Sequence, residues 1–211
     1  KNHKAAYVLS GQFSTKAYKE AARYGDVKVV GSSKDDNFSH IPVLDESEFR
    51  PDADYFHICL NNTIYGTVWH TLPNTGSVPL VADISSCILS KPIDVTKFGL
   101  LYAGAQKNVA PAGLTIVIVR EDLLGETLEG TPTMLDYKVM AENDSMYNTP
   151  PCWPIYISKL VLEWIRDDIG GLAKMEERNV RKAQLLYDFL DQSQLFQGCA
   201  DKDSRSIMNV T

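Results

Sequence analysis

Clustered basic residues are missing from this sequence. Its 211 residues carry 21 Lys and Arg against 27 Asp and Glu, a net charge of −6, and no run of Lys and Arg exceeds two residues. Surfaces that bind nucleic acids usually need Lys and Arg gathered on one face. Nucleic acid is therefore not expected as a partner, and the charged positions are expected on solvated faces.

Cysteine and histidine are scarce. The four histidines show no HExxH spacing, which disfavours a zinc hydrolase, and we expect no bound metal. The cysteines lie far apart without a CxxC pair: Cys59, Cys87, Cys152 and Cys199. Reduced thiols in a cytoplasmic protein are the favoured interpretation, ahead of a zinc site or a disulfide framework.

Long apolar runs are absent too. No run reaches the roughly 18 residues of a membrane span, and the apolar stretch of KNHKAAYVLSG (1–11) is too short for a signal peptide. No membrane partner is expected. The chain starts just before one strand-like run and stops inside another, SIMNVT (206–211), so we expect a fragment of a longer protein.

Strand-like and helix-like segments alternate through the first 125 residues. The strand-like runs are AAYVL (5–9), KVVGSS (28–33), DYFHICL (54–60), VPLVAD (78–83), LLYAGA (100–105) and GLTIVIVRE (113–121). Strands that are apolar on both faces are typical of parallel sheets with helices on each side. The predicted fold class is therefore α/β, with a mostly parallel sheet covered by helices on both faces.

Helical segments are fewer in this half. STKAYKEAARYG (14–25) is predicted to be a helix with Ser14 as its N-cap and Gly25 as its stop, and IDVTKFG (93–99) a short helical piece. The polar residues 34–54 are predicted to form a loop with little regular structure.

The pattern changes after Pro150. CWPIYISKLVLEWIRDDIGG (152–171) and LAKMEERNVRKAQLLYDFLDQS (172–193) both carry apolar residues at helical spacing. We interpret them as a passage between domains. Residues 1–165 are predicted to form a large domain, and residues 166–211 linker helices and the start of a smaller C-terminal α/β domain.

Polar residues follow three of the strand-like runs. Thr63 comes after DYFHICL, Asp83 closes VPLVAD, and Gln106 with Lys107 follows LLYAGA. Parallel α/β sheets bind ligands beyond the carboxyl ends of their strands, so these side chains are expected at one rim. Each has a plainer interpretation: Thr63 as a turn hydroxyl, Asp83 as a helix N-cap or turn residue, Lys107 as an amine paired with a carboxylate.

Nucleotide-binding patterns are lacking, since no GxGxxG follows a strand and no GxxxxGK[ST] occurs. A lysine with an aspartate on a neighbouring strand suits pyridoxal 5'-phosphate (PLP) instead. The amine forms a Schiff base with the cofactor's aldehyde, and the carboxylate keeps the pyridine nitrogen protonated. The small residues Ala103, Gly104 and Ala105 are expected to leave room for the flat ring.

A long stretch around these residues, VADISSCILSKPIDVTKFGLLYAGAQKNVAPAGLTIVIVREDLLG (81–125), resembles the phosphoserine aminotransferases, fold-type-I PLP enzymes of the class-V aminotransferases. Residues 145–165 and 5–25 extend the resemblance to essentially the whole chain. It implies a homodimer that exchanges an amino group between O-phospho-L-serine and 2-oxoglutarate, giving 3-phosphooxypyruvate and L-glutamate in serine biosynthesis. Bacterial members commonly also act on 4-phosphooxy-L-threonine, toward vitamin B6.

The resemblance implies roles for individual residues. Lys107 of AGAQKN matches the Schiff-base lysine that also shuttles the substrate's proton, and Asp83 of VADISS matches the partner of the pyridine nitrogen. Thr63 of NNTIYG matches the residue that hydrogen-bonds the cofactor's 3-hydroxyl oxygen. Gln106 matches one that reaches the phosphate.

Further positions concern the dimer and two departures. Asn148 and Thr149 of YNTPP match a pair that reaches the neighbouring subunit's cofactor phosphate. Phe13 stands where the family commonly has a tryptophan stacked on the ring, so stacking is expected to persist. Asn62 stands where the family often has Glu, which removes one charge beside the site.

The resemblance also leaves alternatives open. The family's N-terminal part, with its Gly-rich loop and substrate-binding arginines, has no counterpart here, nor has most of its small domain. One alternative is therefore a catalytically incomplete fragment that binds PLP. Another is a different fold-type-I enzyme, such as another small-substrate aminotransferase or a cysteine desulfurase, for which Cys87 near the site is the candidate reactive cysteine.

Overall fold

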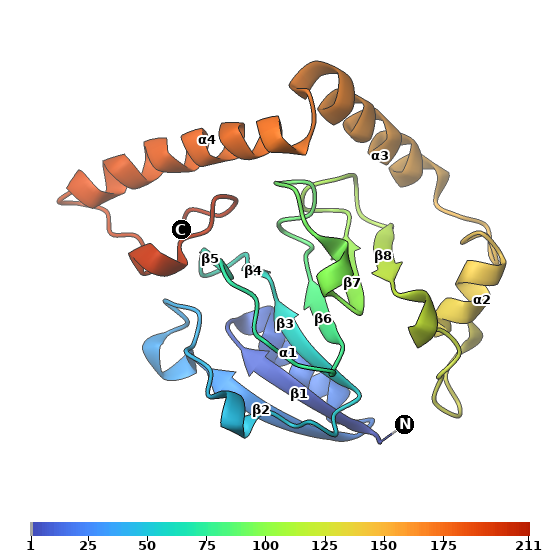
Figure 1. Cartoon of the computed structure of the whole chain (residues 1–211). Coiled ribbons are helices and arrows are strands. Elements are labelled where there is room, and N and C mark those ends of the chain that lie inside the picture. The colour runs from blue at the N-terminus through green and yellow to red at the C-terminus, as the bar shows by residue number, and fades with distance from the viewer. Residues whose placement is uncertain (1) are drawn as a thin grey trace.

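A six-stranded sheet forms the body of the molecule in the computed structural model, which describes residues 2–211 (Figure 1). The strand order is β2-β1-β3-β6-β7-β8. The strands are β1 (Lys4–Leu9), β2 (Asp26–Ser32), β3 (Tyr55–Cys59), β6 (Leu80–Asp83), β7 (Leu100–Gly104) and β8 (Thr115–Val119). The helices are α1 (Gln12–Ala21), α2 (Tyr137–Glu142), α3 (Cys152–Trp164) and α4 (Leu172–Gln192). The predicted α/β class is confirmed.

All neighbouring strands are parallel except the last pair. The apolar run 116–119 favoured another strand in the parallel sheet, covered on both faces, and this was wrong. β8 runs antiparallel to β7 at the edge of the sheet, and Ile118 is 42% exposed. A parallel return needs a crossover of about a dozen residues or more, whereas residues 105–114 between β7 and β8 are turns.

The two faces of the sheet have different coverings. Tyr7 of β1 meets Tyr18 of α1 edge to face, with ring centroids 6.3 Å apart, so α1 covers the face that carries Tyr7. The opposite face holds the core, where Val8, Phe56 and Ile58 are at most 2% exposed. On that side α3 and α4 lie across a cavity of about 1090 Å³ from the sheet.

Helix α1 begins earlier than Ser14, the predicted N-cap. Gly11 is the cap residue, and the Ser14 hydroxyl reaches back to accept hydrogen bonds from the amides of Ser10 and Gly11, both at 3.0 Å. This is the reciprocal half of a capping box, in which the third helical residue satisfies the start of the helix. The helix ends at Ala21, before the predicted stop Gly25.

Gly25 has a different purpose. A Cβ atom on this residue would lie 2.4 Å from the carbonyl oxygen of His3, so the chain's close approach before β2 requires glycine. The other local predictions in this half are confirmed in outline. Residues 93–99 contain a 3-10 turn at Val95–Lys97, and residues 34–54 contain only the short turns Lys34–Asp36 and Glu46–Glu48.

Both helices predicted after Pro150 are present. A π-helical turn at Ile165–Ile169 and Gly170, in the left-handed conformation, separate α3 from α4. The predicted strand SIMNVT (206–211) was wrong, because this segment is irregular. The Ser206 hydroxyl accepts hydrogen bonds from the amides of Met208 and Asn209, a local bonding pattern that competes with strand pairing. No helix within residues 2–211 is long and apolar enough to cross a membrane.

A buried histidine lies under α1 in the middle of the sheet. The His57 ring stacks on Tyr7, with ring centroids 4.5 Å apart, and His57 Nε2 shares a hydrogen bond of 2.9 Å with the hydroxyl of Tyr102. Burial lowers the pKa of His57 from 6.5 to about 3. The unfolded chain therefore takes up this proton first as the pH falls, so stability is complete above pH 6.5 and declines between 6.5 and 3.

We expect the free energy of unfolding to fall by about 2 kcal/mol through His57 between about pH 7 and about pH 5. His57→Gln removes the ionisable ring and should flatten this slope, whereas Tyr102→Phe keeps the ring and should retain it. Urea denaturation at the two pH values measures both. Equal slopes in His57→Gln and the unmodified protein would refute the assignment.

Candidate active site

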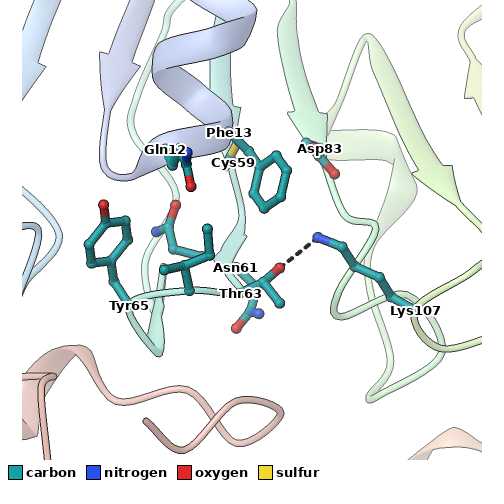
Figure 2. Close-up of a pocket in the computed structure, with 10 residues that line it drawn as sticks. Gln12, Phe13, Cys59, Asn61, Thr63, Tyr65, Asp83 and Lys107 are labelled. Carbon is teal, nitrogen blue, oxygen red and sulfur yellow. Dashed lines mark hydrogen bonds between the residues drawn. The ribbon is translucent and has the colours of Figure 1, made fainter.

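One pocket lies at the carboxyl edge of the parallel strands, on the face covered by α1. It collects the loops that follow β1, β3, β6 and β7, because parallel strands all end at one edge. Its lining residues are Gln12, Phe13, Cys59, Asn61, Asn62, Thr63, Ile64, Tyr65, Asp83 and Lys107. Figure 2 shows Phe13, Thr63, Asp83 and Lys107 turned toward one another from four segments.

Lys107 makes two contacts across the pocket. Its Nζ donates a hydrogen bond of 2.6 Å to Thr63 Oγ1, drawn dashed in Figure 2. The same nitrogen lies 4.3 Å from the centroid of the Phe13 ring, within the range of a cation–π interaction. The amine is thus solvent-accessible and held between a hydroxyl and an aromatic face. No carboxylate pairs with it among residues 2–211, which counts against the plainer interpretation of a structural ion pair.

Asp83 is held by the turn that follows it. Its Oδ1 accepts a hydrogen bond of 2.8 Å from the amide of Ser85, and the Ser85 hydroxyl accepts one of 3.0 Å from the amide of Gly104. In register, Asp83 stands between Cys59 of β3 and Tyr102 of β7, on the face covered by α1. These hydrogen bonds fit the plainer interpretation of Asp83 as a turn residue. The hydrogen bonds within residues 2–211 engage one carboxylate oxygen and leave Oδ2 for a ligand.

Three predicted site residues lie outside the pocket lining. Gln106 is exposed and folds back on the main chain, so that a Cβ atom on Gly104 would meet Gln106 Oε1 at 2.6 Å. Asn148 and Thr149 are exposed in the segment between α2 and α3. Their predicted contacts with a phosphate are not tested by this geometry and stay predictions.

Two of the three small residues near Lys107 do not make room for a ligand. Ala103 and Ala105 are 0% exposed and belong to the apolar core, and neither lines the pocket. Their size reflects packing on the core face of β7, which corrects the expectation that they leave space for a ring. At Gly104, a Cβ atom would meet only the end of the exposed and flexible Gln106 side chain.

Sequence reasoning missed half of the lining: Gln12, Cys59, Asn61, Ile64 and Tyr65. The segment NNTIYG contributes most of these residues. It forms a small hairpin, β4 (Asn61–Asn62) with β5 (Thr67–Val68), that reverses at Gly66 in the left-handed conformation. The sequence signal that could have predicted this hairpin was the pair of asparagines a few residues before a glycine, since these residues favour turns.

Asn62 is a buried amide with matched partners. It is 4% exposed, its Nδ2 donates to Thr67 Oγ1 at 2.9 Å, and its Oδ1 accepts from Ser10 Oγ at 3.1 Å. The neutral amide thus has a hydroxyl partner for both its donor and its acceptor, and places no charge in this buried position.

The two cysteines near the site are poor nucleophiles. Burial raises the pKa of the Cys87 thiol to about 12 and that of Cys59 higher still, and the nearby Asp83 carboxylate raises both further. A thiolate is the reactive form of cysteine. Cys59, Cys87, Cys152 and Cys199 are all free thiols.

Comparisons with known proteins show the family of this chain. The family profile of class-V aminotransferases matches residues 2–211. The phosphoserine aminotransferase of Desulfosudis oleivorans is 54% identical over 208 residues, which are 98% of this chain and 57% of that protein. That of Lysinibacillus sphaericus is 51% identical over 211 residues, 100% of this chain and 58% of that protein.

Solved structures show the same fold. Phosphoserine aminotransferase from Bacillus circulans subsp. alkalophilus superposes with a TM-score of 0.92 at 48% identity, covering 99% of this chain and 58% of that one. A PLP-bound phosphoserine aminotransferase from Trichomonas vaginalis gives 0.90 at 33% identity, covering 98% and 58%. The chain thus spans somewhat under three fifths of its relatives' length. It belongs to the class-V aminotransferase family.

Proposed function

We propose that the protein of which this chain is part is a PLP-dependent transaminase. It would interconvert O-phospho-L-serine and 2-oxoglutarate with 3-phosphooxypyruvate and L-glutamate, with 4-phosphooxy-L-threonine as a related substrate. The observation that carries the proposal is that Lys107, just after β7, and Asp83, at the end of β6, line one pocket. The relatives named above are phosphoserine aminotransferases, which supports phosphoserine as a substrate.

The residues in the pocket suit this cofactor. A ring with an aldehyde and a basic nitrogen needs an amine, a carboxylate and a flat apolar surface, which Lys107, Asp83 and Phe13 provide. Thr63 adds a hydroxyl beside the amine at 2.6 Å. The free carboxylate oxygen of Asp83 and the solvent-accessible amine are the groups that such a ligand would engage.

When bound, PLP supplies an aldehyde that condenses with amines and a pyridine ring that withdraws electrons. Asp83 would hold a proton at the pyridine nitrogen. Lys107 Nζ would hold the cofactor at its aldehyde carbon, and its free amine would act on the proton of the substrate's α-carbon as general base and then general acid. Lys107 Nζ donates a hydrogen bond to Thr63 Oγ1, which keeps the amine at the pocket. With the cofactor bound, the Thr63 hydroxyl would donate to an oxygen of the ring.

Two further parts of the proposal concern regions away from the pocket. Asn148 and Thr149 are exposed, as residues that serve another subunit would be in an isolated chain. We propose a homodimer in which they contact the partner's cofactor phosphate, with Gln106 contacting it from the same subunit. We also propose that the large domain ends near residue 165, at the turn between α3 and α4. The protein is proposed to be cytoplasmic.

The rival functions have less support. A cysteine desulfurase needs a reactive thiolate on an accessible loop, whereas burial keeps Cys87 and Cys59 protonated. A PLP-binding chain without turnover remains the alternative for residues 1–211 alone. Comparing the turnover of this chain with that of the full-length protein decides between them.

The first prediction concerns Lys107. Adding PLP to the full-length protein should give an absorbance band that shifts on reduction with borohydride, and peptide mapping should then find the cofactor on Lys107. Lys107→Ala should lose the label and transamination, while Lys97→Ala, which changes an exposed lysine outside the pocket, should keep both. A label on another lysine, or sulfide release from cysteine in place of amino-group transfer, would refute the proposal.

The second prediction concerns Phe13. Phe13→Ala should raise the dissociation constant of PLP about tenfold, because it removes the flat surface under the ring. Phe13→Trp retains such a surface and should bind PLP at least as tightly as the unmodified protein. Absorbance titration measures both, and the 39% exposure of Phe13 predicts little change in stability. Equal affinities in the Ala and Trp variants would contradict stacking.

The third prediction tests whether Thr149 serves the partner subunit. In a mixed dimer of a Lys107→Ala subunit and a Thr149→Ala subunit, sharing across the interface places both changes in one site. The other site is then intact and should bind one PLP per dimer with unmodified affinity. If Thr149 serves its own subunit, no intact site exists and all binding should be weak, which would refute the shared site.

A further inference from the structure

Asn61 lies in the wall of the pocket, and its side chain is fully engaged. It is 6% exposed. Its Nδ2 donates to Ser86 Oγ and to Asn209 Oδ1, both at 2.7 Å. Its Oδ1 accepts from Ser206 Oγ at 2.5 Å. One amide therefore has three hydrogen bonds to two distant segments of the chain.

The first of these segments carries Asp83. Ser86 follows Asp83 by one turn, and its hydroxyl also donates to the carbonyl oxygen of Asn61 at 3.1 Å. The amide of Leu60 donates to the carbonyl oxygen of Asp83 at 2.9 Å. The hairpin that carries Thr63 is thus bonded through both main chain and side chain to the turn that holds Asp83.

The second segment follows α4 and is seated on the hairpin. The amide of Ser206 donates to the carbonyl oxygen of Gly66 at 2.8 Å. The carbonyl oxygen of Ser206 accepts a hydrogen bond of 2.8 Å from the Tyr187 hydroxyl. A Cβ atom on Gly66 would lie 2.8 Å from the carbonyl oxygen of Asn209. Figure 1 shows the red C-terminal segment beside β4 and β5.

We propose that Asn61 is a positioning residue that sets Thr63 relative to Asp83, and that Asn209 and Ser206 hold Asn61 in place from the segment after α4. The role in cofactor binding rests on the proposed function. The bonding pattern itself does not.

The physical reason is that a buried amide allows few alternative arrangements. Moving the hairpin would leave the buried Asn61 Nδ2 or Ser86, or the half-buried Asn209, without its partner. Thr63 lies two residues along the chain from Asn61 and contacts Lys107. A small displacement of the hairpin therefore moves a pocket wall, and such displacements cost binding and catalysis steeply.

Asn209→Ala is the most direct test in the full-length protein, because it removes one acceptor of Asn61 and lies in a half-buried position. We expect the dissociation constant of PLP to rise about tenfold. Asn209→Asp keeps the acceptor and should restore affinity to within about threefold of the unmodified protein. In an Asn61→Ala background, Asn209→Ala should have no further effect on PLP affinity, because its effect passes through Asn61.

Asn179 provides the matched control. It is 2% exposed and ties α4 to the core by donating to the carbonyl oxygen of Ser90 at 2.9 Å, but it does not line the pocket. Asn179→Ala should lower the free energy of unfolding and leave PLP affinity unchanged. The inference is overturned if Asn209→Ala and Asn179→Ala affect PLP affinity equally, or if Asn209→Ala acts fully in the Asn61→Ala background.

Amide hydrogen exchange separates this inference from the proposed function. Asn209→Ala should speed exchange at Gly66 and Trp69, whose amides bond within the hairpin region, and Asn179→Ala should not. If the unmodified protein fails to bind PLP, the proposed function is wrong, and the exchange rates still decide the inference. Unchanged exchange at these amides in Asn209→Ala would refute the inference alone.

Discussion

The parallel alignment of β1, β3, β6 and β7 is the constraint on which the site depends. Each of these strands ends at the same edge, so residues from positions 13, 63, 83 and 107 of the chain lie around one pocket. Parallel sheets need both faces covered. α1 meets this need on one face, and its first turn brings Phe13 to the edge where the strands end.

Local patterns predicted the parts of the structure that depend on local energetics. The strands were found because β-branched and apolar residues cluster in short runs, and α4 because its apolar spacing persists from Leu172 to Gln192. Lys107, Asp83 and Thr63 were found for a related reason. Each lies at the end of a strand or within a few residues of it, and the carboxyl edge of a parallel sheet is where a ligand binds. Phe13 was found only through the family resemblance.

The remaining features depend on partners far away in the chain. Ser206 lies beside Asn61 only after folding, 145 positions away, and nothing in SIMNVT shows that its serine will turn inward. The edge strand β8 was misread because an apolar run does not report direction, which the length of the preceding connection decides. Gly25 resembled a helix stop because glycine serves equally for a turn and for close backbone contact.

The hairpin at the site, β4 with β5, is held in place mainly by side-chain hydrogen bonds, because its two strands are too short to do so by main-chain pairing alone. Its strands have two residues each, and short isolated hairpins are marginal in water. Asn61 and Asn62, adjacent in a strand, point to opposite sides and bond separate sets of partners. Leaving one such buried group unpaired costs about 1–3 kcal/mol, a large share of the roughly 5–15 kcal/mol that keeps a domain folded. Two neighbouring amides therefore hold Thr63 in place more firmly than the hairpin's backbone could, and they do so from both sides of the strand.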